Sequence, residues 1–409
     1  MNYKKFLARV FVFFMIINGK LSASAKEWKP PEEIKNLYAT SACLMDGESG
    51  RVLFEKNADE VMPMASTTKI MTCIVTLENA DLSDVVTISP KAARQPDVQL
   101  HVNTGETYWL KDLLYSLMLE SHNDAAVAIA EHVGGSVENF AKMMNKKSME
   151  IGCKNTYFIT PNGLDSSDQN GIHGTTAKEL ALIMSYCILK SEKANDFLEI
   201  TQREAYTFHN IEGSRSFSCY NHNAFLKMME GVLSGKTGFT AKAGYCYVGA
   251  LEQNGKKLIV SLLACGWPNH KTYKWSDTRK LMEYGLKNYS YRRFDEITLD
   301  ENKLRPISVK NGQTPRIGET AKATIRVLEV EDKAGNPDKI LMREDEKMEV
   351  VYHIKKELTA PVKKMERIGT IQYLIDGKTW ETKPVVISNT IEKVDFLWCV
   401  QKIRELFFL

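Results

Sequence analysis

The chain has 409 residues, 44% hydrophobic and 26% charged, the composition of an ordinary globular protein long enough for two or three domains. Its formal net charge of +3 is small for this length, so we expect no nucleic-acid partner. No CxxC pair, HExxH motif or His-rich tract occurs, so we expect neither a metal nor another cofactor.

The N-terminus has the pattern of a secretory signal peptide. Lys4, Lys5 and Arg9 precede an apolar run over 10–17, and the small-residue site Ala23-Ser24-Ala25 follows. The run is far shorter than the roughly 20 residues of a spanning helix. A buried first helix is the alternative, but nothing polar patterns the faces of this segment. We therefore expect residues 1–25 to be removed and the protein to be exported.

Eight cysteines occur, and seven are scattered through the main body, mostly in apolar surroundings such as the run 70–75 around Cys73. A domain of this size does not need disulfides for stability, so we expect buried free thiols. The sequence leaves disulfides open. A cysteine nucleophile would need a motif around it, and no cysteine has one.

From about residue 37 to 289 the hydrophobic pattern mixes strands and helices. One hairpin is predicted over 42–55 with its turn at 46–50, and another over 245–264 with Asn254-Gly255 at its turn. Helical periodicity predicts helices over 66–79, 110–132, 137–151, 176–189 and 275–288. Strands at both ends with helices between them indicate an α+β domain, a sheet packed by helices rather than repeating βαβ units.

After residue 291 the pattern changes to short alternating strands over 297–387. Turns are predicted at Asn311-Gly312, Gly335-Asn336-Pro337 and Asp376-Gly377. This indicates a small all-β domain without a nucleophile, suited to spacing or partner contact. We therefore divide the chain into a leader, a mixed α+β domain, a β-rich domain and a tail: 1–25, 26–290, 291–388 and 389–409.

The tail has the pattern of an amphipathic helix. Its apolar residues recur at i, i+4, i+7 and i+11 on one helical face: Phe396, Val400, Ile403 and Phe407. Trp398 and Leu406 interrupt this pattern. The charges of Lys402, Arg404 and Glu405 exclude a membrane-spanning helix. The alternatives are a helix on a membrane surface and a helix packed on the β domain.

Three short motifs stand in the first domain, and each pattern occurs only once: Ser66-Thr67-Thr68-Lys69, Ser121-His122-Asn123 and Lys236-Thr237-Gly238. Any one of them alone is a weak signal, because Ser66 could cap a helix and Lys69 could form a surface ion pair. Together, and in this order, they indicate a serine nucleophile with a lysine base.

The spacing of the first motif suits this chemistry. Ser66 and Lys69 lie three residues apart, so on a helix they share one face. A serine hydroxyl is a weak nucleophile until a neighbouring base accepts its proton, and lysine can be that base only when neutral. The lysine pKa of about 10.4 must then fall by roughly 3, which corresponds to about 4 kcal/mol. We expect burial and the nearby cation of Lys236 to lower it.

The other two motifs supply the remaining roles. We expect Ser121 to relay the proton toward the leaving amine, and Asn123 to hold Lys69 and the substrate amide by hydrogen bonds. The backbone N–H groups of Ser66 and Phe239 would form an oxyanion hole. We assign substrate binding to the third motif and its continuation: Lys236, Thr237, Gly238, Phe239 and Thr240.

With these motifs the chain resembles the low-molecular-weight penicillin-binding proteins that are serine D-alanyl-D-alanine carboxypeptidases, above all their Gram-positive and sporulation-type branch. The likeness rests on segments around and beyond the motifs: 63–71, 121–127, 161–165, 236–240, 243–245, 358–362 and 368–369. It covers nearly the whole chain after residue 25. It implies a β-lactamase/transpeptidase-like catalytic domain, with a five-stranded antiparallel sheet between helices, and a β-rich domain after it.

The resemblance also implies substrate and partners. Such an enzyme removes the terminal D-alanine from peptidoglycan stem peptides through an acyl-enzyme on Ser66, and β-lactam antibiotics inhibit it. Family members end in a helix on the outer face of the cytoplasmic membrane. They usually carry an arginine ahead of the closing helix that reads the substrate carboxylate, and Lys274 is the best positional match. His122 stands where the family usually has Gly or Ala.

Two other enzymes share this acyl-enzyme chemistry. A class A β-lactamase deacylates with a glutamate on a loop after the second motif, and this chain has no Glu between Glu150 and Glu179. A biosynthetic transpeptidase would carry further large domains. A non-enzymatic penicillin-binding protein would require a broken motif, and none is broken.

Overall fold

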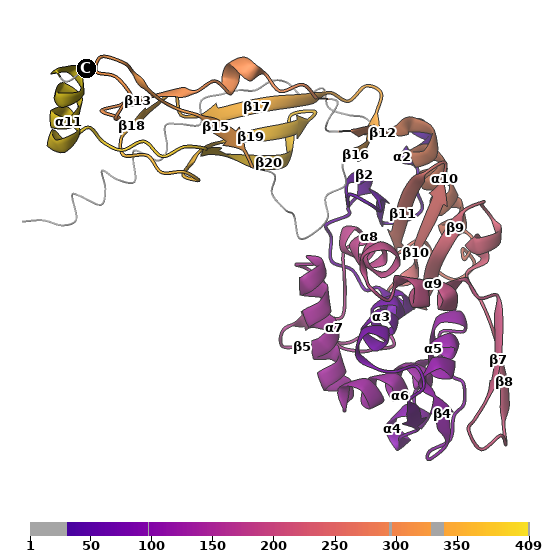
Figure 1. The fold of residues 1–409 in the computed structure, drawn as a ribbon. Coiled ribbons are helices and arrows are strands. Elements are labelled where there is room, and N and C mark those ends of the chain that lie inside the picture. Colours follow the sequence, from indigo (N-terminus) through magenta and orange to yellow (C-terminus); the bar gives the residue numbers. More distant parts are fainter. Residues whose placement is uncertain (1–30, 97, 294–296, 329–338, 408–409) are drawn as a thin grey trace, which may run out of the picture. The chain divides into compact units, whose positions relative to one another are not determined.

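The computed structural model describes residues 31–96, 98–293, 297–328 and 339–407 (Figure 1). The predicted leader and the predicted turn at 335–337 lie outside these residues. The described chain forms two compact units. Within the described residues, the sheet–helix unit comprises 31–96, 98–293 and 339–344, and the β-rich unit comprises 297–328 and 345–407.

A five-stranded antiparallel sheet forms the centre of the sheet–helix unit, as predicted. Its strands lie in the order β2-β1-β11-β10-β9. Their bounds are Ser41–Asp46 (β1), Val52–Lys56 (β2), Val232–Thr240 (β9), Gly244–Gln253 (β10) and Lys256–Leu263 (β11). Asn254 and Gly255 join β10 to β11 with φ values of 53° and 71°. Both positive angles suit the tight turn that this dipeptide predicts.

Helices cover both faces of this sheet (Figure 1). On one face the Ser261 hydroxyl of β11 donates to the Ala177 carbonyl of helix α8 (Ala177–Ser185). On the other face Leu258 of β11 packs against Gly285 of helix α10 (Tyr273–Asn288). Helix α3 (Lys69–Asn79) is buried from Lys69 to Leu77 and belongs to the main hydrophobic core. The catalytic domain predicted as a sheet packed by helices is confirmed.

The predicted single helix over 110–132 is wrong, because the chain breaks inside it. Two helices form instead, α5 (Leu110–Leu119) and α6 (Asn123–Gly134). Between them Ser121 adopts a φ of 70°, a left-handed conformation that no helix continues. The backbone N–H of Asn123 donates to the Val98 carbonyl at 2.7 Å instead of to the preceding turn. The apolar pattern is continuous across this break, so periodicity alone could not reveal it.

The other predicted helices are present with adjusted ends. The segment 66–79 begins as a 3₁₀ turn, Ala65–Thr68, before α3. Helix α7 (Val137–Ile151) has the predicted bounds, and after α8 the chain continues as a π-helical turn over Tyr186–Lys190. Not predicted were α2 (Glu32–Lys35), α4 (Pro90–Ala93), α9 (Ala194–Gln202), and the pairs β3–β4 (Val85–Thr87, Thr107–Trp109), β5–β6 (Ser167–Asp168, Gly171–Ile172) and β7–β8 (Ala205–His209, Ser216–Tyr220).

The β-rich unit contains two small sheets. One has the order β14-β13-β18 (Ala321–Ala323, Ile307–Lys310, Glu357–Thr359) and the other β15-β20-β19-β17 (Ile325–Val327, Lys378–Ile387, Arg367–Ile375, Met348–Ile354). Strand β16 (Lys339–Arg343) belongs to the sheet–helix unit, where it pairs with β12 (Tyr289–Arg293). The chain therefore returns from the β-rich unit to the sheet–helix unit for β16, a crossing that the predicted boundary at 290/291 does not include.

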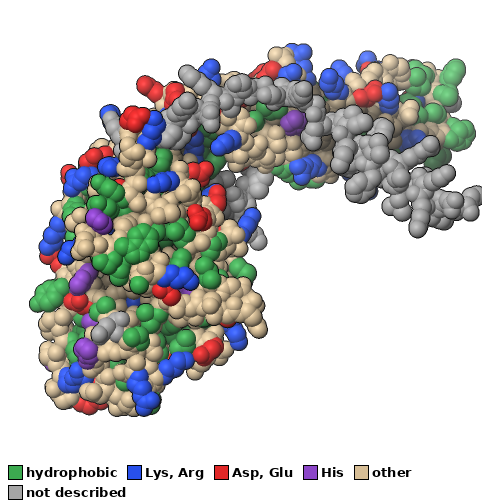
Figure 2. All heavy atoms as spheres, turned by 180° about the vertical axis from the view of Figure 1, so that it is seen from behind, with side chains coloured by type: hydrophobic (Ala, Val, Ile, Leu, Met, Phe, Trp, Pro, Cys, Tyr) green, Lys and Arg blue, Asp and Glu red, His purple; other side chains and the backbone are tan. Residues whose placement is uncertain are grey.

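The tail forms helix α11 (Phe396–Phe407). Six of its hydrophobic side chains are exposed: Phe396, Leu397, Val400, Ile403, Leu406 and Phe407. Figure 2 shows hydrophobic side chains gathered on the surface at this end of the β-rich unit. None of the helices within the described residues is long and apolar enough to cross a bilayer.

All eight cysteines are unpaired, and seven are buried, as expected for free thiols: Cys43, Cys73, Cys153, Cys187, Cys219, Cys246 and Cys265. Burial raises the pKa of each of these thiols; that of Cys246 reaches about 12. A thiol of that kind is a poor nucleophile at neutral pH.

Candidate active site

Ser66 lies on the 3₁₀ turn that leads into α3. The residue before it, Ala65, has a φ of 48°, a conformation that costs an L-residue about 1 kcal/mol. Side-chain hydroxyls hold this turn: Thr67 Oγ1 donates to the Met64 carbonyl at 2.6 Å and Thr68 Oγ1 to the Ala65 carbonyl at 2.8 Å. Ser66 is partly exposed while its neighbours are buried, so its hydroxyl is the accessible group of the turn.

Lys69 is fully buried beneath Ser66. Its Nζ lies 2.9 Å from Ser66 Oγ, 2.9 Å from Asn123 Oδ1 and 2.8 Å from the Asn162 carbonyl oxygen. The Asn123 amide is oriented by its own Nδ2, which donates to the Pro96 carbonyl at 3.0 Å. A neutral amine can donate its two hydrogens to the oxygens of Asn123 and Asn162. Its lone pair then faces the Ser66 hydroxyl, the arrangement that a general base requires.

The surroundings of Lys69 favour this neutral form. Burial and, second, the cation of Lys236 hold the pKa of Lys69 well below its usual value, against the opposing effect of the Asp124 carboxylate. Burial also lowers the pKa of Lys236, to about 7. The two lysines thus show the desolvation and like-charge effects that produce lysine bases.

Ser121 and Lys236 form a second contact above this pair. Lys236 Nζ donates to Ser121 Oγ at 3.0 Å and to the Thr237 carbonyl at 3.1 Å. The break between α5 and α6 presents Ser121 at the site, and α6 begins with Asn123. The three predicted motifs therefore meet through Lys69–Asn123 and Ser121–Lys236.

The third motif runs along β9, the strand at one edge of the sheet. A Cβ built on Gly238 would lie 2.8 Å from the Ser66 backbone nitrogen and 3.0 Å from that of Thr67. Only glycine therefore lets β9 approach so closely the turn Ala65–Thr68, which carries Ser66 and is called the nucleophile turn below. Residue 239, whose N–H is the second predicted oxyanion donor, directly follows Gly238 in the sequence.

The remaining predicted binding residues lie near the end of β9. Thr237 is partly exposed, and the Thr240 hydroxyl accepts a hydrogen bond from Ala243 N at 3.0 Å. Phe239 is 41% exposed, and its ring centroid lies 4.6 Å from that of Tyr245 on β10.

Lys274 lies close to this strand without a direct bond to it. Its Nζ lies 4.6 Å from the ring centroids of both Tyr245 and Trp275. It donates a hydrogen bond to the Lys271 carbonyl, and burial lowers its pKa to about 8. The Tyr245 ring thus contacts both Lys274 and Phe239, and the structure records no bond from Lys274 to the hydroxyls of β9 among the described residues.

His122 takes no part in this network. Its ring is buried, and Nδ1 lies 2.8 Å from the Ser116 hydroxyl. Burial lowers the pKa of His122 to about 4. The histidine at this position is therefore packed against α5 through Ser116.

Sequence reasoning missed the role of Asn162. Its backbone carbonyl accepts from Lys69 Nζ and lies 3.4 Å from Ser66 Oγ. Its side chain shapes the loop, because Oδ1 accepts from Leu164 N at 3.1 Å and Nδ2 donates to Gln95 Oε1 at 3.0 Å. The turn signal Pro161-Asn162-Gly163 could have indicated a shaped loop, but a backbone carbonyl leaves no mark in a sequence.

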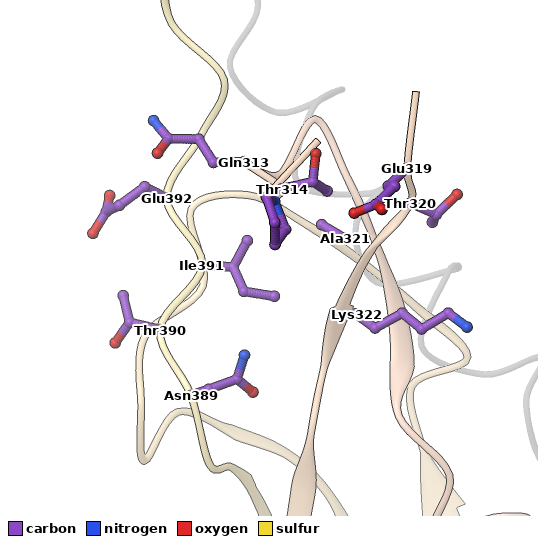
Figure 3. A pocket seen from close by; sticks show the side chains of 11 residues that line it. Gln313, Thr314, Glu319, Thr320, Ala321, Lys322, Asn389, Thr390, Ile391 and Glu392 are labelled. Atoms are coloured by element: carbon purple, nitrogen blue, oxygen red, sulfur yellow. The ribbon is translucent and has the colours of Figure 1, made fainter. Parts of the chain in front are cut away.

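Two other features bear on ligands. Among the described residues, no group of three or more His, Cys, Asp or Glu side chains is arranged to hold a metal ion. A polar hollow in the β-rich unit is lined by residues 313–315, 319–322 and 389–392 (Figure 3). It contains no member of the three motifs, so this hollow is not part of the site that they form.

Comparison with protein families gives two matches. The family model described as D-alanyl-D-alanine carboxypeptidase matches residues 25–265. The model described as the C-terminal domain of penicillin-binding protein 5 matches residues 338–393. The first match contains all three motifs, and the second falls on strands β16 to β20.

Similar proteins cover nearly the whole chain. The D-alanyl-D-alanine carboxypeptidase DacF of Bacillus subtilis strain 168 is 30% identical over 404 residues, 96% of each chain. The solved structure of penicillin binding protein 5 from Haemophilus influenzae is 26% identical and covers 90% of this chain and 100% of its own, with a TM-score of 0.65. The ampicillin-bound form of penicillin-binding protein D2 from Listeria monocytogenes is 31% identical over 63% of this chain and 100% of its own, with a TM-score of 0.54.

Proposed function

The chain belongs to the D-alanyl-D-alanine carboxypeptidase family of serine peptidases, and we propose that Ser66 is the nucleophile with which it removes the terminal D-alanine from peptidoglycan stem peptides. One observation carries this assignment: the buried amine of Lys69 lies 2.9 Å from Ser66 Oγ, with its other two contacts made to oxygen atoms. A base in that position accepts the serine proton as Oγ attacks a carbonyl carbon.

The reaction then proceeds in two steps. Ser66 Oγ bonds to the carbonyl carbon of the penultimate D-alanine, and the N–H groups of Ser66 and Phe239 stabilise the oxyanion. The proton that Lys69 took from Ser66 passes by way of Ser121, which accepts a hydrogen bond from Lys236, to the nitrogen of the departing amine. The C–N bond breaks, free D-alanine leaves, and Lys69 is neutral again. Water next attacks the ester on Ser66, with Lys69 as the base, and releases the shortened peptide and the serine hydroxyl.

The end of β9 is the proposed binding site for the substrate carboxylate. Lys236 supplies a cation, Thr237 and Thr240 supply hydroxyls, and Lys274, whose amine lies against the ring of Tyr245, adds charge. Because Lys274 donates to the Lys271 carbonyl, it would contribute to the local potential rather than grip the carboxylate as a guanidinium does.

A β-lactam presents a carbonyl to the same nucleophile, so we expect penicillins to acylate Ser66 and to act as inhibitors. The ampicillin-bound form of the similar Listeria protein supports this expectation.

The loop after the second motif favours a carboxypeptidase over a class A β-lactamase. In this chain a backbone carbonyl, that of Asn162, faces Lys69 where such a β-lactamase would need a glutamate. The carboxylate of Glu179 does not contact Lys69 in these bonds: it accepts hydrogen bonds from Lys154 N at 2.8 Å and from Thr156 Oγ1 at 2.6 Å. Transfer of the same acyl group to an amine remains the nearest related reaction.

The proposed place of action is the outer face of the cytoplasmic membrane. The basic, apolar and small-residue segments of 1–25 support export. The exposed hydrophobic side chains of α11, interspersed with charges, support a helix that lies in the membrane interface without spanning it.

Release of D-alanine tests this function. The mature protein is incubated with a peptide ending in D-Ala-D-Ala and, separately, with its L-Ala-L-Ala isomer. We expect D-alanine from the first peptide only, and none from the Ser66→Ala variant. A product joined to added glycine, in place of the shortened free acid, would show a transpeptidase. Rapid turnover of penicillin without D-alanine release would show a β-lactamase.

A further inference from the structure

His173 is a buried histidine outside the three motifs whose hydrogen bonds reach the nucleophile turn. Its ring is 2% exposed, and Nε2 lies 2.9 Å from Thr68 Oγ1. Nδ1 accepts from the backbone N–H groups of Ile159 at 2.9 Å and Thr160 at 3.3 Å. The reaction scheme above makes no use of this side chain.

The hydrogen bonds around His173 have only one consistent direction. Because two N–H groups point at Nδ1, that nitrogen is unprotonated, and Nε2 carries the hydrogen. Burial lowers the pKa of His173 to about 4, so the ring is neutral at pH 7. Nε2 therefore donates to Thr68 Oγ1, whose own hydrogen goes to the Ala65 carbonyl. Imidazole, hydroxyl and carbonyl thus form a directed chain.

This chain of hydrogen bonds joins two segments on which the chemistry depends. One segment is the turn of Ala65, which has a φ of 48° and directly precedes Ser66. The other is the loop 159–163, whose Asn162 carbonyl accepts from Lys69 Nζ. The segments are in close contact, since a Cβ on Gly163 would lie only 2.0 Å from the Ala65 oxygen.

We propose that His173 is a positioning residue for acylation: through Thr68 it fixes the turn that carries Ser66, and through Ile159 and Thr160 it fixes the loop that holds Lys69. This inference rests on the proposed role of Ser66. Because His173 and Thr68 are buried and touch no reacting atom, their loss slows acylation and leaves the affinity for the non-covalent complex unchanged.

Variants of Thr68 test the middle group of this chain of hydrogen bonds. The full mature protein is mixed with a fluorescent penicillin, and the acylation rate constant is separated from the non-covalent dissociation constant by varying the penicillin concentration. Thr68→Val removes the hydroxyl at nearly constant volume, and we expect acylation to slow by about 10- to 100-fold. Thr68→Ser keeps the hydroxyl and restores most of the rate.

Thr76→Val is the matched control. Thr76 lies further along α3, is equally buried, and donates to a backbone carbonyl, that of Thr72, at 2.7 Å. It has no part in the chain, so its variant lowers the melting temperature at most and acylates at the wild-type rate.

Variants of His173 test the direction of the bonds. Gln can place an amide donor where Nε2 lies, whereas Asn can place an acceptor where Nδ1 lies but no donor toward Thr68. We expect His173→Gln to acylate faster than His173→Asn. The double variant His173→Asn/Thr68→Val acylates no more slowly than the slower single variant, because both changes break one chain.

Three results would overturn the proposal: wild-type acylation of Ser66 by Thr68→Val, an equal loss in Thr76→Val, or losses that multiply in the double variant. The first two leave the proposed function standing, since Ser66 is still labelled. If the label in the wild-type protein is not on Ser66, the proposed function fails, and this inference fails with it.

Discussion

At the scale of residues, the site depends on keeping a lysine amine neutral inside the protein. Lys69 has no exposed surface, and each of its three close contacts is to an oxygen atom. Desolvation disfavours its charged form, and the Lys236 cation adds to that effect. The lone pair of the amine is therefore available to the Ser66 hydroxyl near neutral pH.

The pH dependence of acylation should report this coupling. The rate rises with pH as Lys69 loses its proton, because only the neutral amine is a base. In Lys236→Gln the neighbouring cation is absent, so the pKa of Lys69 rises and the rising limb of the profile moves to higher pH. In Lys236→Arg a cation is present over the whole range, so the rising limb does not move to higher pH. Acylation rate constants of both variants are measured with a fluorescent penicillin between pH 5 and 10. If the rising limbs of Lys236→Gln and the wild-type protein coincide, the coupling between the two lysines is contradicted.

The side chains of this site could be predicted from short motifs, whereas its backbone groups could not. Ser66, Lys69, Ser121 and Lys236 follow from residue types at fixed spacings, and the structure brings them together. The carbonyl of Asn162 could not be predicted, since every residue has one and only the folded loop selects it.

At the scale of elements, β9 and the nucleophile turn must approach each other closely. Gly238 faces the backbone nitrogens of Ser66 and Thr67, while Gly235 on the same strand faces the Tyr247 hydroxyl. The two glycines thus serve different contacts, one against the site and one within the packing around Tyr247 and Asn223.

Alanine at these two glycines should separate activity from stability. Gly238→Ala pushes β9 away from Ser66 and disturbs the oxyanion donors, so we expect acylation to fall by about 100-fold. Gly235→Ala crowds the Tyr247 hydroxyl, which lowers the melting temperature with a much smaller effect on acylation. Stopped-flow acylation and thermal melts of both variants check this. Equal rates in Gly238→Ala and wild type would mean that the close approach is not needed.

Element types were predicted better than their ends and interruptions. The 245–264 hairpin followed from Asn254-Gly255, whose conformation is local. The break at Ser121 depends on partners distant in sequence, because the Asp124 carboxylate binds Leu100 N at 2.9 Å and Asn123 N binds the Val98 carbonyl. The small hairpin β7–β8 was missed, since its strands are short and half-exposed.

At the scale of the whole molecule, the three motifs and the proposed membrane-binding helix lie in different units. All three motifs lie in the sheet–helix unit, and the exposed hydrophobic side chains of α11 lie in the β-rich unit. Composition and periodicity predicted two regions of different type. They could not predict that β16 returns to pair with β12, because that pairing depends on register between segments about 50 residues apart.

Membrane association should depend on the apolar face of α11. We expect the mature protein to float with liposomes of anionic phospholipid, and a form truncated after Thr390 to remain in the soluble fraction. Ile403→Glu places a charge on the apolar face and weakens flotation. Gln401→Glu adds the same charge on the polar face as a control and has little effect. Equal flotation of the full-length and truncated forms would show that the helix is not the anchor.

The position of the covalent bond tests the central claim most directly. The mature protein is incubated with a fluorescent penicillin, digested, and the labelled peptide is located by mass spectrometry. The label is expected on Ser66, to be absent from Ser66→Ala, and to form more slowly by orders of magnitude in Lys69→Ala. Undiminished labelling of Ser66→Ala, or a label on any other residue of the wild-type protein, would contradict the account.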